Sequence, residues 1–263
     1  MTAAGQNEVV IRVENLRTGF GDFIVHENVS FEIRRGEVFA ILGGSGCGKT
    51  VLLKHMIGLY RPLGGRVLIS GEDIATAQGE RRLAILRRFG VMYQLGALFG
   101  NMTLLENIRL PLEEYTSLPD EAMDLLAETK LRLVNLGGAG HLTPSEISGG
   151  MMKRAAIARA MALDPDIVFL DEPSGGLDPV TSAELDQLVL RLARSLGITF
   201  VVITHELPSI FGIADRCIML DKRVKGIIAE GRPADLRDHS PIPRVRQFFN
   251  REAENEAEAG SAA

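Results

Sequence analysis

Residues 43–50 read Gly43-Gly44-Ser45-Gly46-Cys47-Gly48-Lys49-Thr50, which matches the phosphate-loop pattern G-x-x-x-x-G-K-[ST]. The apolar residues 38–42 precede this stretch, and residues 51–57 follow it with the apolar spacing of an amphipathic helix. In such an order of strand, glycine turn and helix, the glycines let successive backbone N–H groups converge on an anion. We therefore expect a strand and a helix joined by a turn that binds phosphate groups.

Two residues of this loop carry side chains that suit a nucleotide with bound magnesium. Lys49 is expected to reach the β- and γ-phosphates, and the Thr50 hydroxyl is expected to bind Mg²⁺. The alternative is a glycine-rich surface turn, which would need neither the buried strand before it nor the helix after it. The loop therefore predicts a nucleotide-phosphate site in an α/β fold.

The composition is typical of a soluble globular protein, with 263 residues of which 46% are hydrophobic and 24% charged. The net charge of -5 gives no electrostatic reason to expect nucleic acid as a partner. Only Cys47 and Cys217 could pair, and a disulfide inside the phosphate loop would obstruct the ligand, so we expect a reducing compartment. We expect no signal peptide and no transmembrane segment, because no apolar run approaches the roughly 20 residues that span a bilayer.

The remaining strand signals predict a mixed α/β core. Alternating apolar and polar residues at 9–13 and 24–33 indicate half-buried strands, which suggests an antiparallel layer before the loop strand. Residues 66–70, 167–170 and a run ending at Thr204 are typical of further strands. Residues 216–220 and 226–231 resemble a closing hairpin.

Helical spacing dominates the middle of the chain, at 104–112, 121–136 and 150–163. We therefore expect a helical subdomain inserted into the α/β core, which resumes with a helix at 182–196. The composition of the C-terminal residues favours a disordered tail. The expected limits are a loose N-terminus at 1–8, a core at 9–94 and 164–235, the helical subdomain at 95–163, a C-terminal helix at 236–250 and a disordered tail at 251–263.

Two carboxylates, Asp171 and Glu172, end the apolar strand that begins near residue 166. The carboxyl ends of parallel strands face the nucleotide crevice, so Asp171 is expected near the metal ion. Glu172 could then orient and deprotonate an attacking water. The alternative is an acidic pair that caps a helix, which is common after strands.

A second candidate anion site opens the third helix of the subdomain, where the chain reads Ser148-Gly149-Gly150-Met151-Met152. The simple interpretation is that Ser148 caps the helix and the glycines form its turn. The functional interpretation uses the same geometry, because a helix N-terminus with free N–H groups attracts anions. One chain would then carry two phosphate-binding ends on different subdomains.

Taken together, these motifs resemble those of ABC-transporter nucleotide-binding subunits, over residues 9–249 and in the order found in that family. The series comprises 43–50, Gln94, Ser148 to Met152, Asp171-Glu172, Ser174-Gly175-Gly176-Leu177-Asp178 and His205. The resemblance implies a P-loop NTPase of ABC type, with a RecA-like mixed sheet core, an antiparallel β layer and an inserted helical subdomain. It also implies an ATPase that uses ATP and Mg²⁺.

The resemblance implies a role for each matching residue. Gln94 would contact Mg²⁺ and the attacking water, Asp171 would hold the metal through water, and Glu172 would be the general base. His205 would contact the γ-phosphate, and Phe20 would stack on adenine where the family often has Tyr. A core position for Phe20 and a capping or core role for His205 are the structural alternatives.

The family also implies an assembly of two copies that sandwich two ATP molecules head to tail. Residues Ser148, Gly149, Gly150 and Met151 of one copy would close over the nucleotide held by the phosphate loop of the other. This sequence has Met151-Met152 where a polar pair is common and Gly176 where Ala is frequent. Neither departure changes the phosphate-binding backbone, so we expect an active ATPase.

Several further stretches resemble the ATPases of the Mla and Mce-associated phospholipid-transport branch. They are Gly96-Ala97-Leu98-Phe99, Leu110-Pro111-Leu112, Leu118-Pro119, 144–151 and 243–248. This resemblance implies partners: a permease, an Mce-domain lipid-binding protein and a STAS-domain protein, with no nucleic acid. It also implies a peripheral position on the cytoplasmic face of the inner membrane.

The substrate stays open, because Tyr93 and Gln94-Leu95 depart from the pattern often seen at this point of the family. The apolar segment after Gln94 would form a groove for a short helix of the permease, or would simply pack the helical subdomain. A polar-solute importer would share every catalytic residue. A soluble ABC protein of DNA repair or translation would normally carry two cassettes or a long insertion, and neither is found in this sequence.

Overall fold

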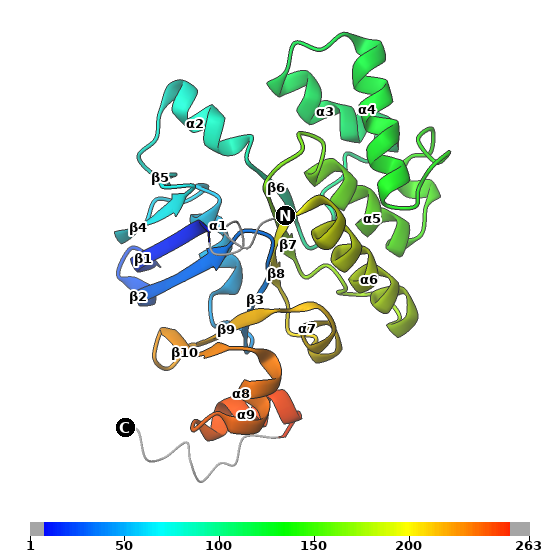
Figure 1. Ribbon diagram of the computed structural model, residues 1–263. Coiled ribbons are helices and arrows are strands. Elements are labelled where there is room, and N and C mark those ends of the chain that lie inside the picture. The colour runs from blue at the N-terminus through cyan, green and yellow to red at the C-terminus, as the bar shows by residue number, and fades with distance from the viewer. Residues whose placement is uncertain (1–7, 253–263) are drawn as a thin grey trace.

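Two β-sheets and a group of helices make up the chain in the computed structural model, which describes residues 8–252 (Figure 1). The expectations of disorder at 1–8 and 251–263 therefore fall almost entirely outside the described residues. Glu8 is described, and its carboxylate pairs with Arg35 at 2.7 Å. The α/β fold with a mixed sheet and an antiparallel layer is confirmed.

The larger sheet has six strands and carries the phosphate loop at the end of a central one. Its inner strands are parallel, because helices connect them, and only the edge strand runs antiparallel to its neighbour. In spatial order the strands are β10 (Gly226–Gly231), β9 (Arg216–Asp221), β3 (Val38–Gly43), β8 (Thr199–Ile203), β7 (Ile167–Asp171) and β6 (Phe89–Met92). β9 and β10 form the hairpin that the sequence predicts.

Alternating residues of these strands face opposite sides of the sheet, both of which are covered, and this explains why the inner strands are largely apolar. Phe169 of β7 packs with helix α1 (Lys49–Met56) and the smaller sheet, whereas its neighbours Val168 and Leu170 pack with the helices on the opposite face. Every residue of β3 is buried. The strand before the phosphate loop is therefore held from both sides.

The smaller sheet is antiparallel and lies over α1 (Figure 1). In spatial order its strands are β2 (Phe23–Arg34), β1 (Val9–Phe20), β4 (Gly64–Ile69) and β5 (Glu72–Asp73). Strand β1 runs seven residues beyond the expected 9–13, whereas β2 exceeds the expected 24–33 by one residue at each end. Their buried side chains, such as Ile11 and Ile33, share a core with Leu52 and Leu53 of α1.

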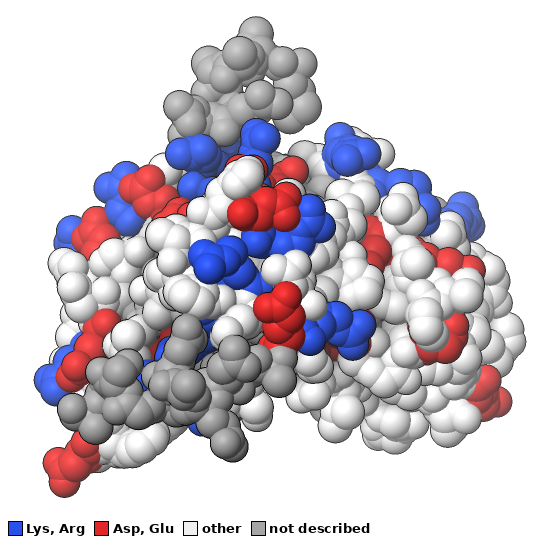
Figure 2. Space-filling model, turned by 90° about the horizontal axis from the view of Figure 1, so that it is seen from below, with Lys and Arg blue, Asp and Glu red and all other residues white. Residues whose placement is uncertain are grey.

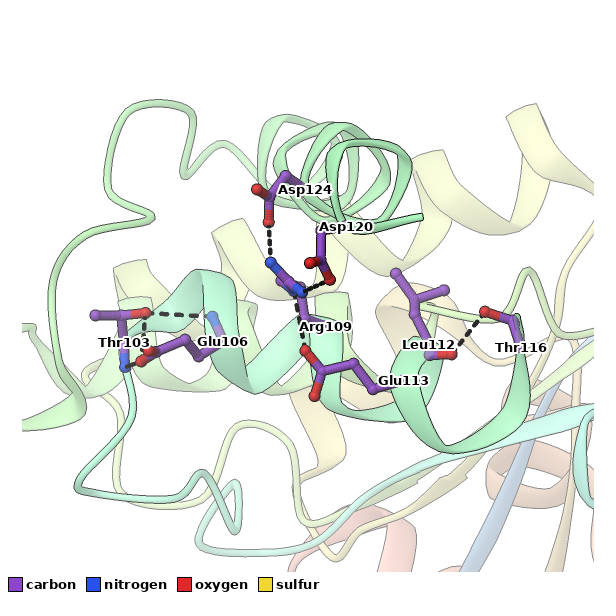
Figure 3. A network of polar contacts seen from close by, with 8 residues as sticks. All are labelled: Thr103, Glu106, Arg109, Leu112, Glu113, Thr116, Asp120 and Asp124. Carbon is purple, nitrogen blue, oxygen red and sulfur yellow. Dashed lines mark hydrogen bonds and ion pairs between the residues drawn. The ribbon is translucent and has the colours of Figure 1, made fainter. Parts of the chain in front are cut away.

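Helices α3 (Leu104–Tyr115), α4 (Asp120–Leu133) and α5 (Gly149–Ala160) lie together between β6 and β7 in the chain (Figure 1). Arg109 of α3 ties α3 to α4, because its guanidinium binds Asp120 at 2.8 Å and Asp124 at 2.6 Å (Figure 3). Its side chain is only 19% exposed, so these ion pairs are partly shielded from water. The N-terminus of α3 is closed by a capping box of Thr103 and Glu106.

The C-terminal part differs from the expected single helix at 236–250. The structure has α8 (Pro233–His239) and α9 (Pro243–Asn250), because Pro241 and Pro243 push the residues before them out of the helical region. Helix α6 (Pro179–Leu196) begins earlier than the expected 182–196, because the Asp178 side chain caps it by accepting from the N–H groups of Val180 and Thr181. Two short helices, α2 (Gly79–Leu86) and α7 (Leu207–Ile213), have no counterpart in the sequence-based expectations. No helix of the part described here has the length and apolarity needed to cross a membrane.

We predict that Gly90→Ala strongly destabilises the fold. Gly90 lies in β6 against the last residue of α5, and a Cβ there would lie 1.8 Å from the carbonyl oxygen of Ala160. Backbone must therefore move, at a cost of about 3 kcal/mol, which lowers Tm by roughly 6–12 °C. Thermal unfolding followed by circular dichroism measures this change.

Gly212→Ala is the matched control, because Gly212 lies in α7 with open space where the Cβ would be. Alanine in that helix should leave Tm unchanged or raise it slightly. Equal Tm values for the two variants would contradict the close approach of β6 and α5.

Candidate nucleotide-binding site

The phosphate loop follows β3 and turns so tightly that side chains are excluded. Gly43 and Gly48 have φ angles of 147° and 93°. A Cβ on Gly43 would lie 2.5 Å from the Leu220 carbonyl oxygen, and one on Gly48 would lie 2.5 Å from His26 Nε2. Glycine is therefore required at both positions, both for the φ angle and for space.

The end of α1 that faces the loop is open to an anion. Its N-cap residue is Gly48, which offers no side-chain cap to the first N–H groups of the helix. Lys49 Nζ donates to the carbonyl oxygens of Gly43 at 2.8 Å and Gly44 at 3.3 Å. The ammonium group thus lies over the loop, where β- and γ-phosphates would meet it.

A buried histidine contacts the backbone of the phosphate loop, and the sequence patterns did not predict this contact. His26 of β2 is fully buried, with Nε2 3.1 Å from the Cys47 carbonyl oxygen and Nδ1 2.8 Å from Thr18 Oγ1. Burial lowers the pKa of His26 below its usual value. In the neutral form Nε2–H donates to the Cys47 carbonyl and Nδ1 accepts from the Thr18 hydroxyl.

The two carboxylates lie at the carboxyl end of β7. Glu172 has a φ of 48°, and its Oε1 lies 2.8 Å from His205 Nδ1, while its Oε2 is buried without a hydrogen-bond partner among the described residues. An unpartnered buried carboxylate oxygen costs free energy, so this oxygen can still accept a hydrogen bond. Burial, and then the charge of Glu172, raise the pKa of Asp171.

A cavity of about 1050 Å³ brings most of the expected site residues together. Four separate segments of the chain meet in it: the phosphate loop with Thr50, and the segments that carry Gln94, Glu172 and His205. At one end lie Phe20 and Phe23, which are 52% and 71% exposed. An exposed aromatic ring suits stacking on a base, so Phe20 stays the candidate for adenine, and Phe23 joins it.

Several residues line this cavity or adjoin it without having been expected. Lys222, Lys225 and Phe248 reach it from the β9–β10 turn and from α9, segments far from the phosphate loop in sequence. Lys153 of α5 donates to the backbone carbonyls of Gln94 and Glu172. In the sequence, the one feature that could have drawn attention to Lys153 is its position among the small apolar residues of α5.

The Ser148 segment begins α5 as expected, with Ser148 Oγ accepting from Met151 N at 3.2 Å. Gly150 packs so closely that a Cβ would lie 2.5 Å from Thr181 Cγ2. None of the four residues Ser148, Gly149, Gly150 and Met151 lines the cavity around Lys49. Within one chain the two candidate phosphate-binding ends are therefore separate.

The donor set fits a nucleotide with magnesium better than a protein-bound metal. Among residues 8–252, no group of three or more His, Cys, Asp or Glu side chains could hold a metal ion alone. Mg²⁺ normally keeps several waters and takes one or two protein oxygens together with phosphate oxygens. The Thr50 hydroxyl and the Asp171 carboxylate at this edge of the sheet match that requirement.

Comparison with known proteins gives a consistent result. The family model described as ABC transporter matches residues 26–175. The chain is 38% identical to the intermembrane phospholipid transport system ATP-binding protein MlaF of Haemophilus influenzae, over 94% of this chain and 93% of that protein. It is 42% identical to the probable ribonucleotide transport ATP-binding protein mkl of Mycobacterium leprae, over 92% and 69%.

A solved structure agrees in fold. The dimeric post-hydrolysis state of the ATP-binding cassette MJ0796, bound to ADP and Pi, superposes with a TM-score of 0.75 at 29% sequence identity. The match covers 84% of this chain and 98% of that chain.

We predict that the stability of the wild-type protein falls as the pH drops through about 6.5 and below, in part because of His26. The folded state keeps His26 neutral, whereas the unfolded state takes up a proton near pH 6.5. The unfolded state thus binds more protons, and stability falls with pH by up to about 1.4 kcal/mol per pH unit for this group. Urea unfolding across this pH range measures the slope.

His26→Gln removes this titration, so the slope should be shallower than that of the wild type. His239→Gln, at an exposed position in α8, is the control and keeps His26 in place. A His26→Gln protein with the wild-type slope would show that folding does not lower the pKa of His26.

Proposed function

The chain belongs to the ABC transporter family, and we propose that it is the ATPase subunit of a transporter that moves phospholipid or another hydrophobic substrate across the bacterial cell envelope. The protein is an ATP-binding and ATP-hydrolysing subunit of an ABC transporter. The observation that carries the lipid assignment is the near full-length similarity to a protein named for phospholipid transport.

The first step of the proposed reaction is phosphate binding. The loop N–H groups and the N-terminus of α1 would receive the β- and γ-phosphates, and Lys49 would exchange the Gly43 and Gly44 carbonyls for phosphate oxygens. Thr50 and Asp171 would hold Mg²⁺, which neutralises charge on the phosphates when bound. Phe20 would orient the nucleotide by stacking on adenine.

Glu172 is the proposed general base. Its Oε2 has no hydrogen-bond partner among the described residues and would receive the proton of the water, and its Oε1 lies 2.8 Å from Nδ1 of His205, whose side chain is 64% exposed and lines the cavity. The water loses its proton to Glu172 as it attacks the γ-phosphorus, and the bond to the β-phosphate oxygen breaks. Gln94, which lines the same cavity, would orient that water.

A second copy of the chain completes the site in this proposal. Ser148, Gly149, Gly150 and Met151 lie outside the Lys49 cavity of their own chain, so they are free to close over the γ-phosphate of a partner. ATP would bridge the two copies, and hydrolysis would remove the bridge and open the pair. The dimeric state of the MJ0796 cassette supports this assembly.

The proposed contact with the permease is the segment after Gln94. Leu95 and Phe99 are 84% and 49% exposed. The backbone of this segment is nevertheless held by hydrogen bonds. Arg159 donates to the carbonyls of Gly96 and Ala97, and buried Asn107 binds both the N–H and the carbonyl of Phe99. A rigid backbone with outward apolar side chains suits a docking surface better than simple packing of the helical subdomain.

We further propose a peripheral position on the cytoplasmic face of the inner membrane, reached through the permease. An Mce-domain lipid-binding protein and a STAS-domain protein are the proposed accessory partners. Nucleic acid is not proposed as a partner, since the net charge is -5. On the face seen in Figure 2, basic and acidic side chains of the described residues are interspersed.

The name of the Mycobacterium leprae relative supports a second candidate, the transport of a ribonucleotide or other polar solute. That relative is as similar in sequence as the phospholipid-transport protein, but this chain covers only 69% of it. Both candidates share the ATPase site, so only transport itself distinguishes them.

Glu172→Gln should bind ATP with near wild-type affinity but lose roughly 10² to 10⁴ in hydrolysis rate. Because the γ-phosphate bridge then persists, the variant should form a stable dimer with ATP and Mg²⁺ on size-exclusion chromatography. Glu206→Gln, which removes a neighbouring carboxylate outside the cavity, is the control. A Glu172→Gln protein that elutes as a monomer with ATP bound would refute the sandwich.

Transport is tested in proteoliposomes that contain this chain and a permease that co-purifies with it. The wild-type complex should move a fluorescent phospholipid between membranes when ATP is added, and Leu95→Asp should abolish both this movement and co-purification with the permease. The isolated Leu95→Asp chain should keep its basal ATPase activity, because Leu95 does not line the nucleotide cavity.

Two results would contradict these assignments. ATP-driven uptake of a labelled ribonucleotide without lipid movement would replace the lipid assignment by the second candidate. Unchanged co-purification of Leu95→Asp would remove the docking surface from the segment after Gln94.

A further inference from the structure

A buried lysine connects three parts of the chain that the proposed mechanism uses separately. Lys153 lies in the N-terminal half of α5, the helix that Ser148 caps, and it is only 7% exposed. Lysine is rarely this buried unless its ammonium group is paired. Its Nζ donates to two backbone carbonyl oxygens, that of Gln94 and, at 3.2 Å, that of Glu172.

The two acceptors lie just beyond the carboxyl ends of adjacent parallel strands. Gln94 follows β6, and Glu172 follows β7. The lysine side chain therefore extends from the helical subdomain to the edge of the sheet at which ATP would bind. Since Lys153 does not line the nucleotide cavity, it acts through the backbone of residues that do.

The backbone of Glu172 needs such support. Its φ of 48° lies in the left-handed region, which costs a residue with a side chain about 1–2 kcal/mol. Three hydrogen bonds hold it there: Glu172 N donates to Ile203 O at 2.8 Å, and Glu172 O accepts from Gly175 N at 3.2 Å and from Lys153. The Lys153 bond is the one that originates outside the sheet and its loops.

The negative charges of nearby carboxylates favour the protonated, positively charged form of Lys153. Burial lowers the pKa of Lys153, and the charges of Glu172, Asp171 and Glu206 oppose this effect. The positive charge in turn acts on Asp171, whose pKa burial raises and Lys153 helps to lower. A neutral side chain of the same length would keep the packing but lose both the charge and the donors.

We propose that Lys153 is a positioning residue, which fastens the start of α5 to the backbone of Gln94 and Glu172. A single side chain thereby positions two parts of the machinery. One is the pair Gln94 and Glu172, which would activate water in this chain's nucleotide site, and the other is the Ser148 segment, which would contact the nucleotide of the partner. When the Ser148 segment closes over the partner's nucleotide, Lys153 then couples this movement to the positions of Gln94 and Glu172 at the nucleotide of its own chain. This inference rests on the proposed roles of Gln94, Glu172 and Ser148.

Lys130 offers a matched comparison within the helical subdomain. It is 4% exposed, and its Nζ pairs with the carboxylate of Asp164 in the loop after α5. Like Lys153 it is a buried lysine that ties a helix to another segment. Unlike Lys153, it contacts no residue of the nucleotide site, so its loss should affect stability alone.

The experiment compares Lys153→Met, Lys153→Arg and Lys130→Met in ATPase kinetics, nucleotide binding and thermal unfolding. Lys153→Met should lower kcat by roughly 10- to 100-fold, because small displacements of catalytic groups have effects of that size. Its Kd for a fluorescent ATP analogue should stay within about threefold, since the phosphate loop is untouched. Lys130→Met should lower Tm and leave kcat unchanged, and Lys153→Arg should recover part of the lost kcat because it keeps charge and donors.

A second readout concerns the partner's site. In the Glu172→Gln background, Lys153→Met should weaken the ATP-dependent dimer, whereas Lys130→Met should not. If Lys153→Met is not recovered folded, Lys153→Gln replaces it, since its amide can still donate to one of the two carbonyls. Its kcat should fall by less than the loss expected for Lys153→Met, and in the Glu172→Gln background it should still weaken the ATP-dependent dimer.

The proposal is overturned if Lys153→Met keeps kcat within twofold of the wild type, or if its kcat falls and its Kd for the ATP analogue rises by the same factor. It is overturned as well if the kcat of Lys153→Arg is no higher than that of Lys153→Met. It is also overturned if the Glu172→Gln dimer is indifferent to Lys153. Its failure can be distinguished from failure of the proposed function. An active Glu172→Gln protein would reject the assigned general base, whereas an inactive one beside a fully active Lys153→Met would reject only the positioning role.

Discussion

The close approach of backbone atoms around the phosphate loop is the constraint on which the rest of the structure depends. The loop has no space for a Cβ at Gly43 or Gly48, because the Leu220 carbonyl and the His26 ring already occupy it. These contacts come from β9 and from β2, one in each sheet. The two sheets must therefore pack together before the loop can take its shape, and the nucleotide site is a product of the whole fold.

Local patterns were sufficient for the parts of the site that lie within one element. The phosphate loop, the strand ending in Asp171 and the cap at Ser148 follow from residues close in sequence, and their elements are found where the patterns predicted them. The family resemblance added Gln94 and His205, which line the same cavity as the loop. The prediction of a single C-terminal helix was wrong, since the two prolines at 241 and 243 outweigh the helical spacing around them.

Residues whose importance comes from distant partners could not be found in this way. His26 and the Cys47 carbonyl that it binds are 21 positions apart, and Lys153 is 59 positions from Gln94. In the sequence each resembles an ordinary residue of a strand or a helix. Short helices such as α7 were missed for a related reason, because seven residues carry too little periodicity to predict a helix.

The position of Cys47 has a consequence for the chemical durability of the enzyme. Its side chain is 3% exposed beneath the loop, and burial raises the pKa of its thiol, as burial raises that of Cys217 to about 12. The thiolate is the form that reacts with peroxide and alkylating agents, so both groups are kept in their inert form and out of reach. Burial therefore slows the oxidation and alkylation of both thiols.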